Sequence, residues 1–209
     1  MEDVLHLSNL PFAAGRPLVC FDERRVPLWG EVVAPLPIQE RRPNRSDYED
    51  EREGTAVLRV AFEPLTGKRI VETSRQRTNA DDGRCMQRVA ASFPQAEKIV
   101  LVQDNLKTHN ASSFYETLPP ADAFQLAPRF ERHDTPKKGS WLNMAELELS
   151  ALSPICLSRR SGSIEKLDRQ IQALVTERNE LKIKVEWQFS ISQAREKLHR
   201  HYENAKSKN

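Results

Sequence analysis

A short apolar run in the middle of the chain, from Ile99 to Val102, leaves few folds open to this sequence. Its hydrophobicity is continuous rather than alternating, which is typical of a strand buried on both faces. This run leads to Asp104, and a similar run from Leu18 to Phe21 ends at Asp22. Strands of this kind occur in parallel sheets covered by helices, so the two runs predict an α/β protein with a mixed sheet, not a helical bundle or a β-sandwich.

Turn, cap and periodicity signals predict the other elements. A hairpin joins strands 56–62 and 69–73 through a turn that holds Pro64 and Gly67. Residues 34–54 contain three prolines and a dense mixture of charges, which indicates a long surface loop. A helix over 79–91 begins at an Asn79 cap. Further predicted elements are helices at 112–117, 121–126, 139–157, 164–174 and 192–202 and a strand at 129–133.

The composition narrows the class of protein. Of the 209 residues 38% are hydrophobic and 30% charged, and the net charge of +2 permits nucleic-acid binding without requiring it. The three cysteines, Cys20, Cys85 and Cys156, show no CxxC spacing, which argues against a disulfide scaffold and a structural zinc site. No apolar run approaches the ~18 residues of a membrane span and no signal peptide is visible, so we expect a cytoplasmic protein.

Acidic residues stand where an α/β sheet collects its functional groups. Asp22 and Asp104 close the two predicted buried strands, and the carboxyl ends of neighbouring parallel strands meet at one crevice. Glu146 shares a face of the following helix with Asn143, whereas Glu148 lies about 200° around that helix, so we choose Glu146. Three carboxylates without a Cys or His pair suit Mg²⁺ or Mn²⁺, and two such ions support phosphodiester chemistry.

The alternative for each acid alone is structural. An aspartate at a strand end is more often a turn former or a helix cap than a ligand, and a glutamate on an amphipathic helix is usually solvated. Only the joint pattern favours a site.

Three segments carry a family resemblance, namely 19–23, 100–109 and 135–146. They resemble the signature blocks of the DDE transposases, more narrowly the insertion-sequence 630 group of the mariner superfamily. The resemblance implies an RNase H-like fold and a metal-dependent DNA endonuclease that cleaves transposon ends and transfers strands into a target. It makes Asp22, Asp104 and Glu146 the catalytic residues and the ligands of two Mg²⁺ or Mn²⁺ ions.

The same blocks supply accessory candidates. Asn105, His109 and Asn143 are candidates for a role near the site, although for His109 a hydrogen bond at a helix start is an equal alternative. Lys137 and Lys138 directly precede the helix of the third acid, so they are the candidates for phosphate contacts with DNA.

The resemblance also sets expectations for organisation and partners. We expect an RNase H-like catalytic domain over 1–160 and a C-terminal helical extension over 161–209. Only 21 residues precede Asp22, so we expect helix-turn-helix modules to be absent from this chain and to come, if present, from a separately encoded part. We expect DNA as the partner and the nucleoid as the cellular location. A homodimer is the assembly that we consider.

Two other functions remain open. One is an inactive, truncated transposase remnant that binds DNA non-specifically. The other is a phosphatase with an aspartyl nucleophile, but the sequence Asp22-Glu23-Arg24 lacks the second acid that such a site usually places two residues after the first.

A few residues have mainly structural predictions. Trp141 is expected to pack in the core rather than against DNA. The stripe Ile164, Leu167, Ile171 and Leu174 is expected to pack internally, with dimerisation as the alternative. The pair Arg24-Arg25, like the other basic pairs outside 137–138, is expected to be ordinary surface charge.

Overall fold

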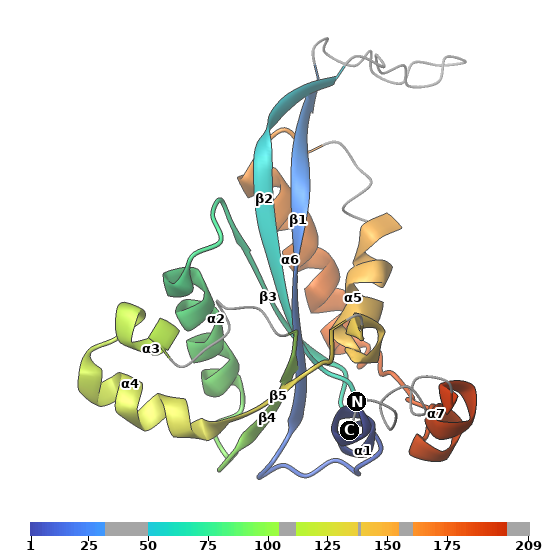
Figure 1. Cartoon of the computed structure of the whole chain (residues 1–209). Helices are drawn as coiled ribbons and strands as arrows, with labels where there is room; N and C mark the ends of the chain where they lie inside the picture. The colour runs from blue at the N-terminus through green and yellow to red at the C-terminus, as the bar shows by residue number, and fades with distance from the viewer. Residues whose placement is uncertain (32–49, 105–111, 138, 155–160, 200–209) are drawn as a thin grey trace.

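A five-stranded mixed sheet organises the chain in the computed structural model, which describes residues 1–31, 50–104, 112–137, 139–154 and 161–199 (Figure 1). The strands lie in the order β3-β2-β1-β4-β5. Pairing is antiparallel between β1 and β2 and between β2 and β3, and parallel between β1 and β4 and between β4 and β5. The predicted α/β class with a mixed sheet is therefore confirmed. The strands are β1 (Leu18–Glu31), β2 (Asp50–Glu63), β3 (Lys68–Ser74), β4 (Ile99–Gln103) and β5 (Phe130–Asp134).

Strand β1 is much longer than its apolar run, so the prediction that it ends at Asp22 is wrong. Its recorded parallel register with β4 spans Leu18 to Cys20, whereas its antiparallel pairing with β2 continues to Glu31. Beyond Asp22 the strand has alternating burial, with Val26 buried and Arg25 exposed. The continuous apolar pattern stops because the strand loses one neighbour there, although the strand itself does not stop.

The hairpin of β2 and β3 is confirmed, and Gly67 has the positive φ of 77° that its turn requires. The predicted loop over 34–54 is wrong at its end, because β2 already begins at Asp50. The rest of that prediction, 34–49, lies outside the described residues.

One face of the sheet is covered by α2 (Asn79–Ser92), with α3 (Ser112–Thr117) and α4 (Pro120–Leu126) beside it and a 3-10 turn, η1 (Ala127–Arg129), before β5 (Figure 1). The cap of α2 is Thr78, not the predicted Asn79. The Thr78 hydroxyl accepts a hydrogen bond from the Asp81 N–H at 3.1 Å, and the Asp81 carboxylate accepts one from the Thr78 N–H at 3.2 Å. This reciprocal capping box satisfies two amides at the helix start.

The other face carries α1 (Glu2–Ser8), α5 (Ala145–Leu152), α6 (Ile164–Glu180) and α7 (Ile191–Lys197). Helix α1 has no side-chain cap and was not predicted. The predicted helix over 139–157 is wrong at its start, because a 3-10 turn, η2 (Ser140–Leu142), comes first and α5 begins only at Ala145. That turn buries Leu142 and leaves Trp141 45% exposed, so the prediction of a core tryptophan is wrong.

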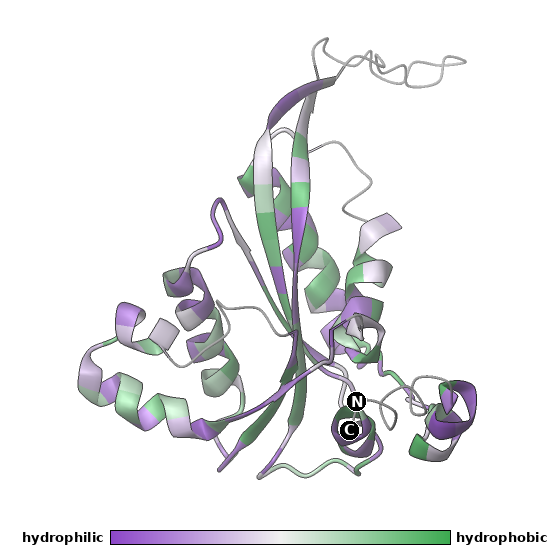
Figure 2. Ribbon diagram, in the orientation of Figure 1, coloured by the Kyte–Doolittle hydropathy of each residue, from purple (hydrophilic) through white to green (hydrophobic). Residues whose placement is uncertain are grey.

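Alternate residues of β1 feed two separate cores. Leu18 and Cys20 pack with α5 and α6, while Val19 and Phe21 pack with α2. Helix α6 buries Leu167 and Ile171, with Ile164 and Leu174 packed at the margin, which confirms that this stripe packs internally. Figure 2 shows much of β2 and of α6 as apolar. In the described part of the chain, no helix is long and apolar enough to cross a membrane.

Candidate active site

Asp22 lies on β1 where the parallel pairing with β4 has ended, and it points to the face that α5 covers. It is 8% exposed, and one carboxylate oxygen accepts a hydrogen bond from the Glu23 N–H at 2.7 Å. Burial raises the pKa of Asp22 to about 7, and the negative charges of Glu146, Asp104 and Glu23 act in the same direction. The carboxyl group is thus buried beside like charges.

Asp104 follows β4, whose five residues are all buried. The recorded register pairs Cys20 with Val102, so extending it by two residues brings Asp104 level with Asp22. The effect of Asp104 on the pKa of Asp22 agrees with this placement. Asp104 itself is half-buried. The first two predicted acids therefore lie next to each other, just beyond the parallel pairing of β1 with β4.

Glu146 comes from the first turn of α5, which packs against β1 and β2. Its side chain is 36% exposed, and Arg24 approaches it with Nη2 to Oε2 at 3.9 Å. Arg24 also donates to the Ser153 hydroxyl at 2.5 Å, at the other end of α5. This arginine, expected to be surface charge, therefore lies beside the candidate site, and a basic pair in a sequence carries no signal that separates the two cases.

Asn143 connects the first and third acids. It is buried, its Nδ2 donates to the Phe21 carbonyl at 2.7 Å, and its Oδ1 accepts from the Ala145 N–H at 3.2 Å. The Asn143 carbonyl also accepts from the Glu146 N–H at 3.0 Å. Asn143 precedes α5 instead of sharing a helical face with Glu146, so that part of the prediction is wrong. Its amide instead ties the start of α5 to β1 next to Asp22.

Glu148 has a different environment from Glu146. It is 1% exposed, and its carboxylate accepts hydrogen bonds from Arg69 at 2.9 Å and from Arg178 at 2.8 Å. The two glutamates of α5 thus point to different partners, one toward Asp22 and Arg24 and the other into a buried ion-pair cluster.

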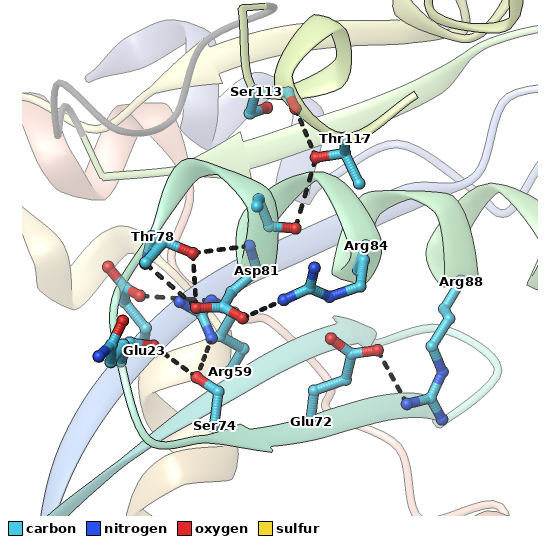
Figure 3. Close-up of polar contacts among 12 residues, drawn as sticks. Glu23, Arg59, Glu72, Ser74, Thr78, Asp81, Arg84, Arg88, Ser113 and Thr117 are labelled. Atoms are coloured by element: carbon cyan, nitrogen blue, oxygen red, sulfur yellow. Dashed lines mark hydrogen bonds and ion pairs between the residues drawn. The ribbon is translucent and has the colours of Figure 1, made fainter. Parts of the chain in front are cut away.

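A polar network supports β1 from the opposite face (Figure 3). The Glu23 carboxylate lies 3.6 Å from Arg59 Nε and closer still to Arg77. Arg59 is buried and donates to the Ser74 hydroxyl at 2.7 Å. Because the Glu23 N–H bonds to Asp22, this network helps to hold the backbone donor that fixes one oxygen of the first acid.

The three acids have the donor atoms that a divalent cation prefers, but their side chains are not arranged to share one ion. Burial and the charges of Glu146 and Asp104 raise the pKa of Asp22, and a bound cation would stabilise its carboxylate form; carboxylates are also the ligands that Mg²⁺ and Mn²⁺ prefer. Among the described residues, however, no three His, Cys, Asp or Glu side chains form a group ready to hold a metal ion. Holding one ion by all three acids therefore requires a rearrangement of the site.

The remaining predicted residues divide in two. Lys137 is exposed just before η2, where a DNA contact would be sterically open. Asn105, His109 and Lys138 lie outside the described residues.

Comparisons with known proteins show the family and the fold of the chain. Residues 17–168 match a family described as DDE superfamily endonuclease. No curated protein matches the chain.

Solved structures of a transposase are similar to the chain. They are the Mos1 transposase paired-end complex with left transposon end (TM-score 0.56, 12% identity, 87% of this chain and 56% of that one), the Mos1 mariner paired end complex with Mn (0.51, 15%, 87% and 54%) and the Mos1 Strand Transfer Complex (0.52, 14%, 80% and 49%). At these identities the likeness shows a shared fold, which is RNase H-like. The chain spans about half the length of these transposase chains.

Proposed function

The chain belongs to the DDE superfamily endonucleases, and we propose that it is the catalytic part of a DNA transposase. In the proposed reaction, water attacks a phosphodiester at the end of the element, and the freed 3′-hydroxyl then attacks target DNA. Neither attack needs a covalent intermediate with the protein. A buried serine or cysteine nucleophile is therefore not required.

The observation that carries the proposal is the environment of Asp22. A buried carboxylate whose pKa is raised by burial and by two acids from β4 and α5 is costly to maintain for structure alone. These three acids are the ones that the signature blocks single out. A carboxylate with a strongly raised pKa, next to the point where the parallel pairing of β1 with β4 ends, is a candidate for a functional role.

We propose that Asp22, Asp104 and Glu146 hold Mg²⁺ or Mn²⁺, with two ions in the active complex. When bound, such ions lower the pKa of the attacking water or hydroxyl and stabilise charge on the phosphate. One of the similar structures is a paired-end complex with Mn, which supports the choice of cation.

Residues around the acids have positioning roles in this proposal. Asn143 holds the first turn of α5 against β1, so it sets the separation of Glu146 from Asp22. Arg24 balances the charge of Glu146 before a cation binds. Release of Glu146 from Arg24 is the smallest rearrangement that would turn the third carboxylate toward the other two.

DNA is the proposed partner, since the similar structures include a transposase paired-end complex with a transposon end and a strand transfer complex. We also propose that two copies of the chain act together, as the paired-end complexes suggest by analogy.

The test is metal-dependent nicking of supercoiled plasmid by the purified chain. Wild type should nick in Mg²⁺ or Mn²⁺ and not in EDTA, whereas Asp22→Asn, Asp104→Asn and Glu146→Gln should lose nicking because each removes a carboxylate charge. Glu97→Gln serves as the matched control, because Glu97 is exposed and the same change there should leave nicking intact. Circular dichroism checks that each variant is folded.

Equal nicking by wild type and all three variants would refute the assignment. Salt-sensitive DNA binding without metal-dependent nicking or metal binding by the wild type would instead favour the inactive remnant.

A further inference from the structure

An open hollow of about 480 Å³ lies along the outer part of the β1–β2 hairpin. It is lined by Arg25 and Pro27 from β1, by Arg52, Thr55 and Val57 from β2, and by residues 75–77 after β3. Successive side chains of a strand alternate between faces, so Arg25 opens on the face of β1 opposite Asp22. Four of the lining residues are arginines, and among the described residues that line the hollow none is acidic.

The charge of this arginine hollow is only partly balanced. Arg77 pairs with Glu23, and Arg75 makes an exposed pair with Glu165 at 3.2 Å. Arg52 donates to the Thr55 hydroxyl at 3.3 Å, and this acceptor carries no charge. Within the described ranges no carboxylate forms an ion pair with Arg25 or Arg52. The hollow therefore presents surplus positive charge to an anion from solution.

The spread of the arginines suits a polymer better than a small anion. Trp29 pairs with Arg52, and Arg25 pairs with Val57, so Arg25 and Arg52 stand four residues apart along the hairpin, about 13 Å. Arg75 follows β3, two strands away from Arg25, which adds a width of about 10 Å. Phosphates of one DNA strand recur about every 3.4 Å along the axis, so these guanidinium groups span several successive phosphates.

DNA bound at the three acids can also reach the hollow. Arg25 follows Asp22 by three residues, or about 10 Å along β1. The recorded pairing of β1 with β4 has ended by Cys20, so no described strand lies on that edge of β1 beyond Asp22. Figure 1 shows the outer part of β1 and β2 extending away from β4 and β5. A duplex at this edge can contact both faces of β1.

We propose that the arginine hollow binds the phosphate backbone of duplex DNA next to the acids, without reading its sequence. This inference rests on the proposed function in one respect, since it takes DNA as the ligand of the neighbouring acids. Guanidinium groups bind phosphate oxygens in a bidentate manner. Arginine at these positions therefore matches the geometry of a phosphate better than lysine does, although both carry one positive charge.

The test measures binding of the full chain to a labelled duplex of arbitrary sequence by fluorescence anisotropy, over a series of salt concentrations and in EDTA. Arg25→Ala and Arg52→Ala should each weaken binding on the order of tenfold at about 0.1 M salt. Each should also reduce the slope of log K against log salt by about 0.9, because each removes one phosphate contact. The lysine variants at both positions should keep most of the slope.

Lys184→Ala is the matched control. Lys184 is exposed and adjoins Val185, which bonds to Pro64 beyond the other end of β2. If the arginine variants change affinity and slope no more than this control, the proposal is overturned. Tighter binding of an RNA duplex of the same sequence, or displacement of DNA by inorganic phosphate at equal phosphate concentration, would overturn it as well. Binding is measured in EDTA, so it does not depend on nicking. A wild type that fails to nick plasmid would therefore refute the proposed function, while the binding assay could still be interpreted.

Discussion

Replacing Glu148 with glutamine should destabilise the chain strongly while leaving the three candidate acids in place. Its carboxylate lies between Arg69 and Arg178, and Arg69 is itself buried, donating also to the Ile183 carbonyl at 2.8 Å. Glutamine keeps the shape of the side chain and removes its charge. The change therefore leaves a buried guanidinium group without its counter-charge, which is the costly way to break an ion pair.

The magnitude follows from the burial of this cluster. Removing one partner of a buried, hydrogen-bonded pair costs about 3–5 kcal/mol. Unfolding entropy of about 2.1 cal/mol/K per residue amounts to about 0.44 kcal/mol/K for 209 residues. The melting temperature should therefore fall by about 7–11 °C, as measured by differential scanning calorimetry or circular dichroism.

The same pair predicts a pH dependence. Burial alone would raise the pKa of Glu148, but the hydrogen bonds and charges of Arg69 and Arg178 outweigh it and lower that pKa below its usual value. A carboxyl with a lowered pKa in the folded state contributes stability above its unfolded pKa, about 4.3, and loses it as the pH falls through the folded value. The difference in stability between wild type and Glu148→Gln should therefore shrink below about pH 4.

The control is Glu165→Gln, which removes the same charge from an exposed pair with Arg75 and should leave the melting temperature unchanged. A drop of less than about 2 °C for Glu148→Gln at neutral pH would show that the cluster is not the stabilising unit inferred from its burial. So would a stability difference that does not depend on pH.

Three further outcomes are expected. Asn143→Ala should cost about 1–3 kcal/mol in urea unfolding, because it removes a buried hydrogen bond to β1, and should lower nicking per folded molecule; unchanged nicking would contradict its positioning role. Thr78→Ala should cost about 1 kcal/mol through loss of the capping box, and an unshifted urea midpoint would speak against that cap. Burial raises the pKa of Cys20 to about 12 and that of Cys85 well above its usual value, so in a Cys156→Ser background thiol reagents should react only as fast as the protein unfolds; rapid labelling at neutral pH would be inconsistent with this burial.

Sequence patterns predicted the elements of the fold that depend on residues close to one another in the sequence. The apolar run of β4, the turn at Gly67 and the periodicity of α6 are local signals, and each element is present. The extent of β1 is not local, since it depends on β2 continuing beside it after β4 has ended. The short helix α1 has neither a side-chain cap nor the length to stand out.

The candidate site divides in the same way. Strand-end position and the family blocks were enough to single out Asp22, Asp104 and Glu146, and their mutual placement agrees with that choice without testing it. The contacts of Arg24 and Asn143 could not be inferred, because their partners lie more than 100 residues away in sequence. The exposure of Trp141 depends on a 3-10 turn where helical periodicity indicated an α-helix.

The bond from the Asn143 amide to the Phe21 carbonyl has a consequence for how such chains can diverge. It holds the start of α5, and with it the third acid, against β1. The position of the third acid therefore does not depend on the length of the chain between the second acid and the third. Residues gained or lost in the connections around α3 and α4 would alter the count between Asp104 and Glu146 while leaving their separation in space unchanged.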